Sequence, residues 1–304
     1  MNNNNALKVG KLVGETSTFE ACGVQCAATL YRPDTGADKV PALLTIHGWG
    51  GVQGLMITDF IEKFVALGMA VMTFDYPGWG KSEGKHRHTI HPAKRTGVAD
   101  KALAHLKAQP GIDTNRLFVW GTSLGGGHAV ELAASHPELK AVVAQVPMLD
   151  GIAAVAANSF SRMARFSVDI ALDIAQPWKT HYLPTISSKG GYSSMDRDGA
   201  DRAIEWTKAQ ENFEYDNRLA AASLLRMGPY RPIKKLGQIK VPTLLIGARG
   251  DTVAPFPEKR VRAAASKDVE IRVIDGNHFD PYFPPVAEQN LGFQMEFLRK
   301  HLKQ

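Results

Sequence analysis

The sequence has little of what would mark a disulfide-rich, disordered or membrane-spanning protein. Only two cysteines occur in 304 residues, and no apolar run reaches the roughly 18 residues of a membrane-spanning helix. The closest run, residues 141–160, is interrupted by Gln145, Pro147 and Asp150. Hydrophobic residues make up 44% of the chain and charged residues 22%, near the averages for globular domains. A folded protein with a large core and no membrane partner is therefore expected.

The two cysteines, Cys22 and Cys26, lie in a segment whose pattern predicts extended backbone. Residues four apart on one strand are roughly 13 Å apart, whereas a disulfide needs Cα atoms within about 7 Å. A disulfide is excluded unless a turn intervenes at Gly23, and no neighbouring ligands complete a zinc site. Two reduced thiols, together with no recognisable leader in residues 1–10, predict a cytoplasmic protein.

The net charge of +6 is modest for this length and is spread along the chain. The densest basic stretch, residues 226–240, is not accompanied by an aromatic-interleaved basic motif. It predicts a solvated surface, so no nucleic-acid partner is expected. The sequence leaves open whether the chain is a monomer or a homodimer.

Short apolar runs alternate with amphipathic stretches over most of the chain. After an extended region near 17–31, strands are predicted at 41–47, 70–75, 116–121, 139–146, 241–248 and 269–275. Helices are predicted from residue 60, near 92–109, from Ser123 to before Pro137, between the last two strands, and near 286–302. Apolar strands that are each followed by a helix predict an α/β fold with a mostly parallel sheet covered on both faces.

Residues 148–240 interrupt this alternation with a long, mostly helical and aromatic-rich pattern. An insertion of this size between two strands predicts a helical cap over the carboxyl edge of the sheet. The expected division is therefore a core of residues 1–147 and 241–304 and a cap of residues 148–240. Most aromatic side chains of the cap are expected to form its own small core, and the others to line a pocket.

The most informative segment is V-W-G-T-S-L-G-G-G-H, which contains G-x-S-x-G at Gly121, Ser123 and Gly125. It follows a predicted buried strand and opens a helix, which is the setting of a nucleophile elbow. The sharp turn places the serine in a strained backbone conformation, and the flanking glycines allow close approach of the neighbouring elements. Ser123 is therefore the predicted nucleophile.

A serine nucleophile needs a base that is oriented by a carboxylate. Asp251 follows the strand that ends near Gly247, and His278 follows the strand that ends near Ile274. This order, acid and then histidine after the serine, is the one that the elbow motif requires. Asp251 is therefore the predicted acid and His278 the predicted base, and Asp275 and Asp280 stay open as weaker alternative acids.

The oxyanion of an acyl-transfer intermediate needs two backbone N–H donors close to the nucleophile. Leu124, directly after the serine, is predicted to supply one. The loop H-G-W-G-G at residues 47–51 follows a predicted strand, and Trp49 is the expected second donor.

Four segments together resemble the α/β-hydrolase superfamily from about residue 18 to the last helix: H-G-W-G-G, F-D-Y-P-G-W-G-K-S-E-G at 74–84, G-T-S-L-G-G and G-N-H-F-D. Within it the chain resembles dienelactone-hydrolase-like and X-Pro-peptidase-like members, including fungal polyketide-transferase-type enzymes. Dienelactone hydrolases proper use a cysteine where this chain has Ser123. An H-G-G-P loop typical of prolyl peptidases is absent, which puts amide cleavage in doubt.

The expected activity is hydrolysis of a small-molecule carboxylic ester or thioester through an acyl-enzyme, with no cofactor and no metal. The alternatives are acyl transfer to an alcohol or amine, a peptidase-like amide hydrolase, and a receptor that keeps the three residues as a binding pocket. His86, His88 and His91 lie close enough in sequence to suggest a metal site. They have no neighbouring acidic pair, so a solvated loop at the pocket rim is the favoured interpretation.

Overall fold

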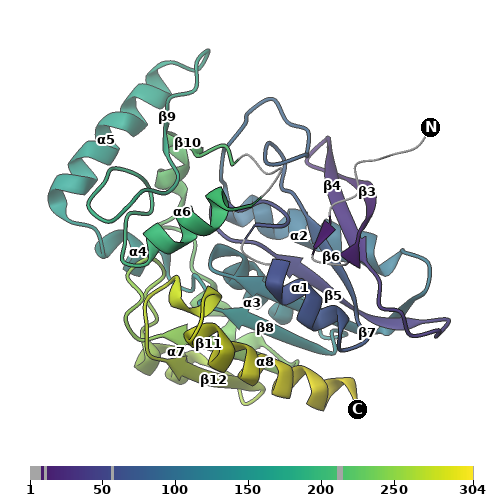
Figure 1. The fold of residues 1–304 in the computed structure, drawn as a ribbon. Helices are drawn as coiled ribbons and strands as arrows, with labels where there is room; N and C mark the ends of the chain where they lie inside the picture. Colours follow the sequence, from purple (N-terminus) through teal and green to yellow (C-terminus); the bar gives the residue numbers. More distant parts are fainter. Residues whose placement is uncertain (1–7, 10–11, 56–57, 211–214, 304) are drawn as a thin grey trace.

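A computed structural model describes residues 8–9, 12–55, 58–210 and 215–303 of the chain (Figure 1). The prediction that residues 1–10 hold no leader falls mostly on residues 1–7, which lie outside the described residues. No helix in the described part combines the length and the hydropathy that crossing a membrane requires.

The centre of the molecule is an eight-stranded sheet in the order β12-β11-β8-β7-β5-β6-β4-β3. The first six strands of that order run parallel, and the β3–β4 hairpin extends the sheet antiparallel beside β6. The bounds are β3 (Glu15–Ala21), β4 (Val24–Tyr31), β5 (Val40–Ile46), β6 (Ala70–Phe74), β7 (Ile112–Thr122), β8 (Ala141–Gln145), β11 (Thr243–Ala248) and β12 (Val269–Ile274). A separate two-stranded pair joins β1 (Lys8–Val9) to β2 (Leu12–Val13).

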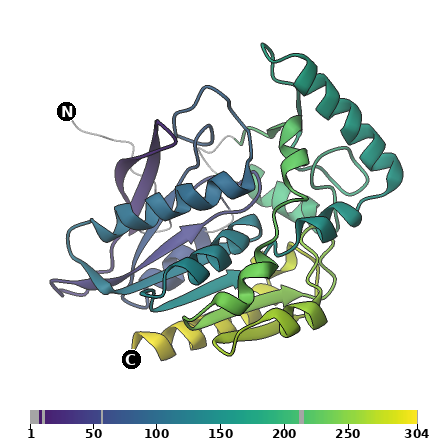
Figure 2. The same cartoon turned by 180° about the vertical axis from the view of Figure 1, so that it is seen from behind.

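Helices cover both faces of this sheet, which explains why its strands are apolar without alternation. The helices α1 (Thr58–Val65) and α8 (Val286–Leu302) pack on one face, in front in Figure 1. The helices α2 (Pro92–Lys107), α3 (Leu124–Ser135) and α7 (Glu258–Ala264) pack on the other, seen in Figure 2. Successive side chains of β7 point to opposite faces: Leu117 packs on the face with α2, α3 and α7, and Phe118 packs on the face with α1 and α8. The predicted α/β class and mostly parallel sheet are confirmed.

The segment that carries both cysteines is a hairpin and not one extended run. Cys22 and Gly23 form its turn with φ of 54° and 74°, the left-handed region. Both thiols are free, with Cys22 exposed and Cys26 buried, and burial raises the pKa of the Cys26 thiol to about 11. The two thiols are therefore unpaired even though a turn separates them.

The described part of residues 148–240 contains three α-helices, two short strands and two 3₁₀ helices. They are α4 (Gly151–Ala156), α5 (Phe160–Ala175), β9 (Tyr182–Pro184), α6 (Ala200–Lys208), β10 (Arg218–Ala220), η1 (Ala221–Arg226) and η2 (Pro232–Gln238). The antiparallel β9–β10 pair is not predicted from the sequence, because three-residue strands so far apart in the chain leave no local periodicity. The division into core and cap stays a prediction.

Candidate active site

Ser123 lies at a sharp turn between β7 and α3. Its backbone has φ 55° and ψ −123°, a conformation that non-glycine residues rarely adopt. The surrounding backbone holds it there: the Ser123 amide donates to the Gln145 carbonyl at 3.0 Å, and its carbonyl accepts from the Met148 amide at 2.8 Å. The turn therefore presents the side chain outward from the carboxyl end of β7.

The two glycines of the motif are required by close backbone contacts. A Cβ at Gly121 would lie 2.2 Å from the Gly125 carbonyl oxygen, and one at Gly125 would lie 2.1 Å from the Ile46 carbonyl oxygen. Each of these gaps is far shorter than a van der Waals contact, so any side chain would push β7, α3 and β5 apart.

His278 and Asp251 come together with Ser123 from two separate loops after β12 and β11. His278 Nε2 lies 3.0 Å from Ser123 Oγ, and His278 Nδ1 lies 2.6 Å from Asp251 Oδ2. The second carboxylate oxygen accepts from the Val253 and Ala254 amides at 2.8 and 2.7 Å. All three of the predicted residues are buried, which shields these hydrogen bonds from water.

The two alternative acids point elsewhere. The Asp275 side chain is 90% exposed and binds Arg249. Asp280 accepts from the Asn277 amide at 2.8 Å and lies 3.6 Å from the Arg202 guanidinium. The carboxylate of Asp251 is the one of the three that reaches the imidazole.

Two backbone N–H groups beside Ser123 have no hydrogen-bond partner among the described residues. One belongs to Leu124, the first residue of α3, and the other to Trp49. The loop that carries Trp49 passes directly over the serine, because a Cβ at Gly48 would lie 2.8 Å from Ser123 Cβ. Both predicted donors are thus free to bind an oxyanion, and the helix dipole of α3 adds a positive end.

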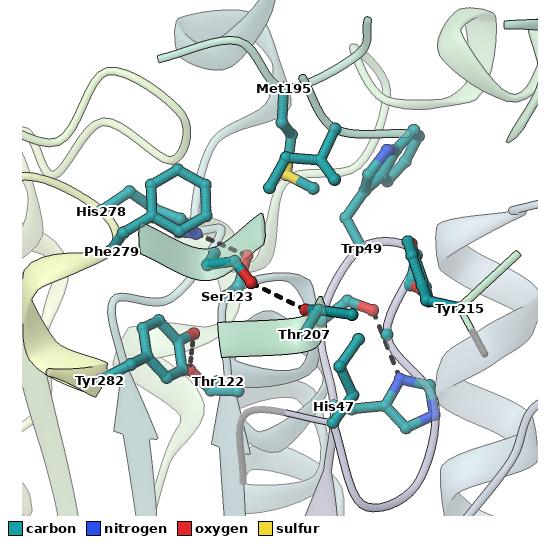
Figure 3. A pocket seen from close by; sticks show the side chains of 16 residues that line it. His47, Trp49, Thr122, Ser123, Met195, Thr207, Tyr215, His278, Phe279 and Tyr282 are labelled. Atoms are coloured by element: carbon teal, nitrogen blue, oxygen red, sulfur yellow. Dashed lines mark hydrogen bonds between the residues drawn. The ribbon is translucent and has the colours of Figure 1, made fainter. Parts of the chain in front are cut away.

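Side chains from residues 148–240 hold this loop in place, and one of them, Tyr215, is labelled beside it in Figure 3. The Tyr215 hydroxyl donates to the Gly50 carbonyl at 2.9 Å, and burial raises the pKa of Tyr215 to about 12. The Trp49 indole N–H donates to Ser194 Oγ at 3.0 Å, and that hydroxyl donates to the Thr185 carbonyl at 2.6 Å. The sequence indicates Tyr215 only as one of the aromatic side chains of residues 148–240. It gives no signal for Ser194 and Thr185, which are polar residues of a region with no motif.

Asp75, from the segment at 74–84, joins two loops beneath the site. It is buried, and it accepts hydrogen bonds from the Gln53 amide, the Gln53 side chain and the Lys81 amide at 2.7–2.9 Å. This motif therefore fixes the loop after β5 and supplies no group to Ser123.

A buried cluster of amides connects the serine turn to the last helix. Gln145 Nε2 donates to Thr122 Oγ1, and Gln145 Oε1 accepts from Asn290 and Gln294 at 2.6 and 2.9 Å. The Thr122 hydroxyl also bonds the hydroxyl of Tyr282, four residues after His278. In the sequence, Asn290 and Gln294 look like surface residues of an amphipathic helix.

His47 lies beneath the loop with its ring fully enclosed. Its Nδ1 faces the Gly48 carbonyl at 3.4 Å, and its Nε2 has no partner among the described residues. Burial, with a smaller contribution from the Arg95 charge, lowers the pKa of His47 to about 3. Burial also holds the pKa of His128, in α3, well below its usual range.

Two cavities meet at Ser123, and Trp49 and Met195 line both. The smaller one, about 70 Å³, is lined on one side by His278, Phe279 and Tyr282 (Figure 3). The larger one, about 290 Å³, has mainly apolar walls from residues 148–240, namely Met148, Ala154, Val155, Met163, Phe166, Ile170, Leu224, Leu225 and Met227. Among the described residues no aspartate or glutamate lines either cavity.

The histidine-rich segment differs from the expected solvated loop. His88 is buried and its Nε2 lies 2.9 Å from Asp216, while His86 is exposed. Tertiary packing against Trp79 and Tyr182 encloses the His88 ring, which the polar local sequence does not indicate. Within the described residues no three His, Cys, Asp or Glu side chains are grouped so that they could hold a metal ion.

Several known proteins are similar to this chain in sequence. A family model described as serine aminopeptidase, S33, matches residues 38–278. The chain is 30% identical to the quorum-quenching protein AidA of Acinetobacter baumannii, over 93% of each chain. It is also 29% identical to the thiohydrolase aneE of Aspergillus aculeatus, over 46% of this chain and 43% of the relative.

A similar solved structure is that of the α/β hydrolase GrgF from a Penicillium species. The TM-score is 0.77 at 20% identity, with 96% of this chain and 99% of that chain covered. At this identity the likeness shows a shared fold.

The buried histidines predict that the protein loses stability in mild acid. In the unfolded chain a histidine binds a proton below about pH 6.5, whereas in the folded protein His47 stays neutral down to about pH 3. The unfolded state therefore binds more protons between these two pH values, and the free energy of unfolding falls as the pH falls through this window. Each such histidine contributes up to about 1.4 kcal/mol per pH unit. Urea denaturation at pH 7, 6 and 5 measures the slope.

The variant His47→Gln should show a shallower slope than the wild type, by up to about 1.4 kcal/mol per pH unit. The control is His86→Gln, since that ring is exposed in the folded protein as well. An unchanged slope in His47→Gln would contradict the assignment of the acid sensitivity to this ring.

Proposed function

The chain belongs to the α/β-hydrolase family described as serine aminopeptidase, S33, and we propose that it cleaves a carboxylic ester or thioester through an acyl-enzyme on Ser123. The hydrogen-bonded series Ser123–His278–Asp251 is the observation that carries this proposal. The names of two relatives, a thiohydrolase and a polyketide transferase, support an acyl group as the part of the substrate that is transferred.

In the first step Ser123 Oγ attacks the acyl carbon while His278 Nε2 takes its proton. Asp251 holds the imidazole in the tautomer that carries a proton on Nδ1, and its charge stabilises the imidazolium. His278 then returns the proton to the departing alcohol or thiol. Water, deprotonated by the same nitrogen, releases the acid and restores Ser123.

The negative charge on the substrate oxygen is stabilised by the Trp49 and Leu124 amides. Both are unpaired before substrate arrives, so no hydrogen bond must be broken to use them. Loss of a single donor of this kind typically costs about 100- to 1,000-fold in kcat.

Each of the two cavities at Ser123 holds one part of the substrate, the leaving group or the acyl chain. The leaving group must lie beside His278, because His278 protonates it. Since His278 lines the smaller cavity, the leaving group occupies that cavity. The acyl chain then occupies the larger, apolar cavity, for which residues 148–240 act as a cap. The substrate class is therefore an apolar acyl group on a small leaving group.

A second candidate is transfer of the acyl group to an alcohol or amine. The apolar walls of the larger cavity favour it, because they disfavour water near the acyl-enzyme. Adding a small alcohol to an ester assay and measuring the ratio of new ester to free acid separates the two outcomes.

Aminopeptidase activity has less support. Recognition of a free α-amino group calls for a buried carboxylate, and neither cavity has one among its described lining residues. Hydrolysis of p-nitrophenyl esters without hydrolysis of aminoacyl p-nitroanilides is the expected pattern.

Ser123→Ala should abolish covalent labelling by a fluorophosphonate and lower ester turnover by roughly 10⁶-fold. Labelling is measured by intact-protein mass spectrometry, and circular dichroism checks that the fold is retained. Labelling of the variant at full stoichiometry would place the nucleophile elsewhere.

Asp251→Asn should lower kcat by roughly 10³–10⁴-fold, because an amide at this position favours the wrong imidazole tautomer. The matched control is Asp275→Asn, since that carboxylate is exposed and bound to Arg249. Steady-state kinetics on one ester compares the two variants. Equal losses in both would remove Asp251 from its proposed role.

The acyl cavity should set a preferred chain length. Each methylene that enters it adds up to about 0.8 kcal/mol, or roughly fourfold in kcat/KM, until the cavity is full. A series of p-nitrophenyl esters from acetate to decanoate should therefore rise, reach a maximum at short to medium chains, and fall.

Val155→Phe, which narrows the cavity, should move that maximum to shorter chains. Val168→Phe is the matched control, because Val168 lies on α5 with 61% of its surface exposed and outside the cavity. If both variants keep the wild-type profile, the acyl chain does not occupy this cavity.

A further inference from the structure

A third cavity, of about 470 Å³, lies away from Ser123 between α2, the segment 76–91 and residues 173–226. It shares none of its described lining residues with the two cavities at the serine. Its size is in the range of small-molecule sites. The histidine-rich segment, which the proposed reaction does not use, contributes His86 and His91 to its wall.

The charged lining of this cavity is mainly positive. Lys94, Arg95 and Arg226 line it, and none of them forms a salt bridge with a described residue. Asp173 is the carboxylate in the described lining, and its two oxygens already accept from the His181 and Ala222 amides at 2.8 Å. The described lining therefore holds more positive than negative charge, and no described carboxylate forms a salt bridge with its three cations.

Arg95 is the innermost of the three cations. It is 4% exposed, and both terminal nitrogens of its guanidinium have no hydrogen-bond partner among the described residues. The guanidinium lies 4.2 Å from the centroid of the Tyr76 ring, which also lines the cavity. It also lies 5.2 Å from the centroid of the Trp79 ring. A buried cation that contacts aromatic rings but no described anion is destabilising unless an anion approaches it.

His91 adds a further unsatisfied polar atom at the same place. Its Nδ1 is buried without a partner among the described residues. Burial and the nearby charges of Arg226 and Lys94 lower the pKa of His91, as expected where positive charge accumulates.

From this cluster we infer that the cavity is a second ligand site, which binds a multiply charged small oxyanion, a phosphate or carboxylate compound. Lys94 and Arg226 bind it from the rim, and Arg95 supplies the buried charge beneath it. Tyr76, Pro77 and Val98 offer apolar walls for the remainder of the molecule. The site is independent of the proposed chemistry at Ser123.

The test uses pyrophosphate and citrate as probes for the phosphate and carboxylate forms. Each is titrated into the full-length protein by calorimetry, and Tm is measured against sodium chloride of equal ionic strength. Binding of either probe should raise Tm above the salt control. Protein labelled with a fluorophosphonate should bind equally well, since the serine lies outside this cavity.

Lys94→Gln and Arg226→Gln should each weaken binding at least about tenfold, the usual effect of losing one charged hydrogen bond. Arg95→Met should weaken it further, and the two rim variants keep the test valid if Arg95→Met does not fold. Lys101→Gln is the matched control, an exposed lysine of α2 outside the cavity.

Three results would overturn the proposal. They are no rise in Tm above the salt control with either probe, an equal loss of affinity in Lys101→Gln, and loss of binding in the fluorophosphonate-labelled protein. The second would mean general charge screening, and the third would place the anion at Ser123.

Discussion

The close approach of β5, β7 and α3 around Ser123 is the constraint on which the site depends. Gly121 and Gly125 leave no room for a side chain, and Ser123 adopts a strained left-handed backbone between them. Strain of this kind costs of order 1–3 kcal/mol and persists only where the surroundings enforce it. Here the β8 backbone and the packed helix enforce it, so the serine stays directed at His278 and at the two unpaired amides.

Supporting contacts extend this constraint in two directions. The loop after β5 is held on one side by Tyr215 and Ser194, which belong to the segment after β8. It is also held by Asp75, which accepts two hydrogen bonds from Gln53. The proposed oxyanion donor Trp49 thus depends on residues of the predicted cap. The predicted cap therefore contributes to the shape of the proposed acyl cavity and also to the position of the proposed oxyanion donor.

The distribution of buried charge separates two regions of the molecule. Around Ser123 the larger cavity has mainly apolar walls, and the side chains of Ser123, His278 and Asp251 are hydrogen-bonded to one another. In the third cavity, which Tyr76 also lines, Arg95 is buried beside Lys94 and Arg226 and makes no salt bridge with a described residue. Because a buried cation without a counter-ion is costly, the proposed anionic ligand would stabilise this second region.

The sequence by itself determined the α/β class, the order of the main strands and helices, and the three segments that carry Ser123, Asp251 and His278. It did so because buried parallel strands are continuous apolar runs and because the serine turn requires glycines at fixed spacing. Only the tertiary structure decided which carboxylate meets His278, since Asp251, Asp275 and Asp280 all lie in loops at the same edge of the sheet. It also decided the β9–β10 pair, the enclosure of His88 and the isolation of Arg95, because each depends on contacts between segments far apart in the chain.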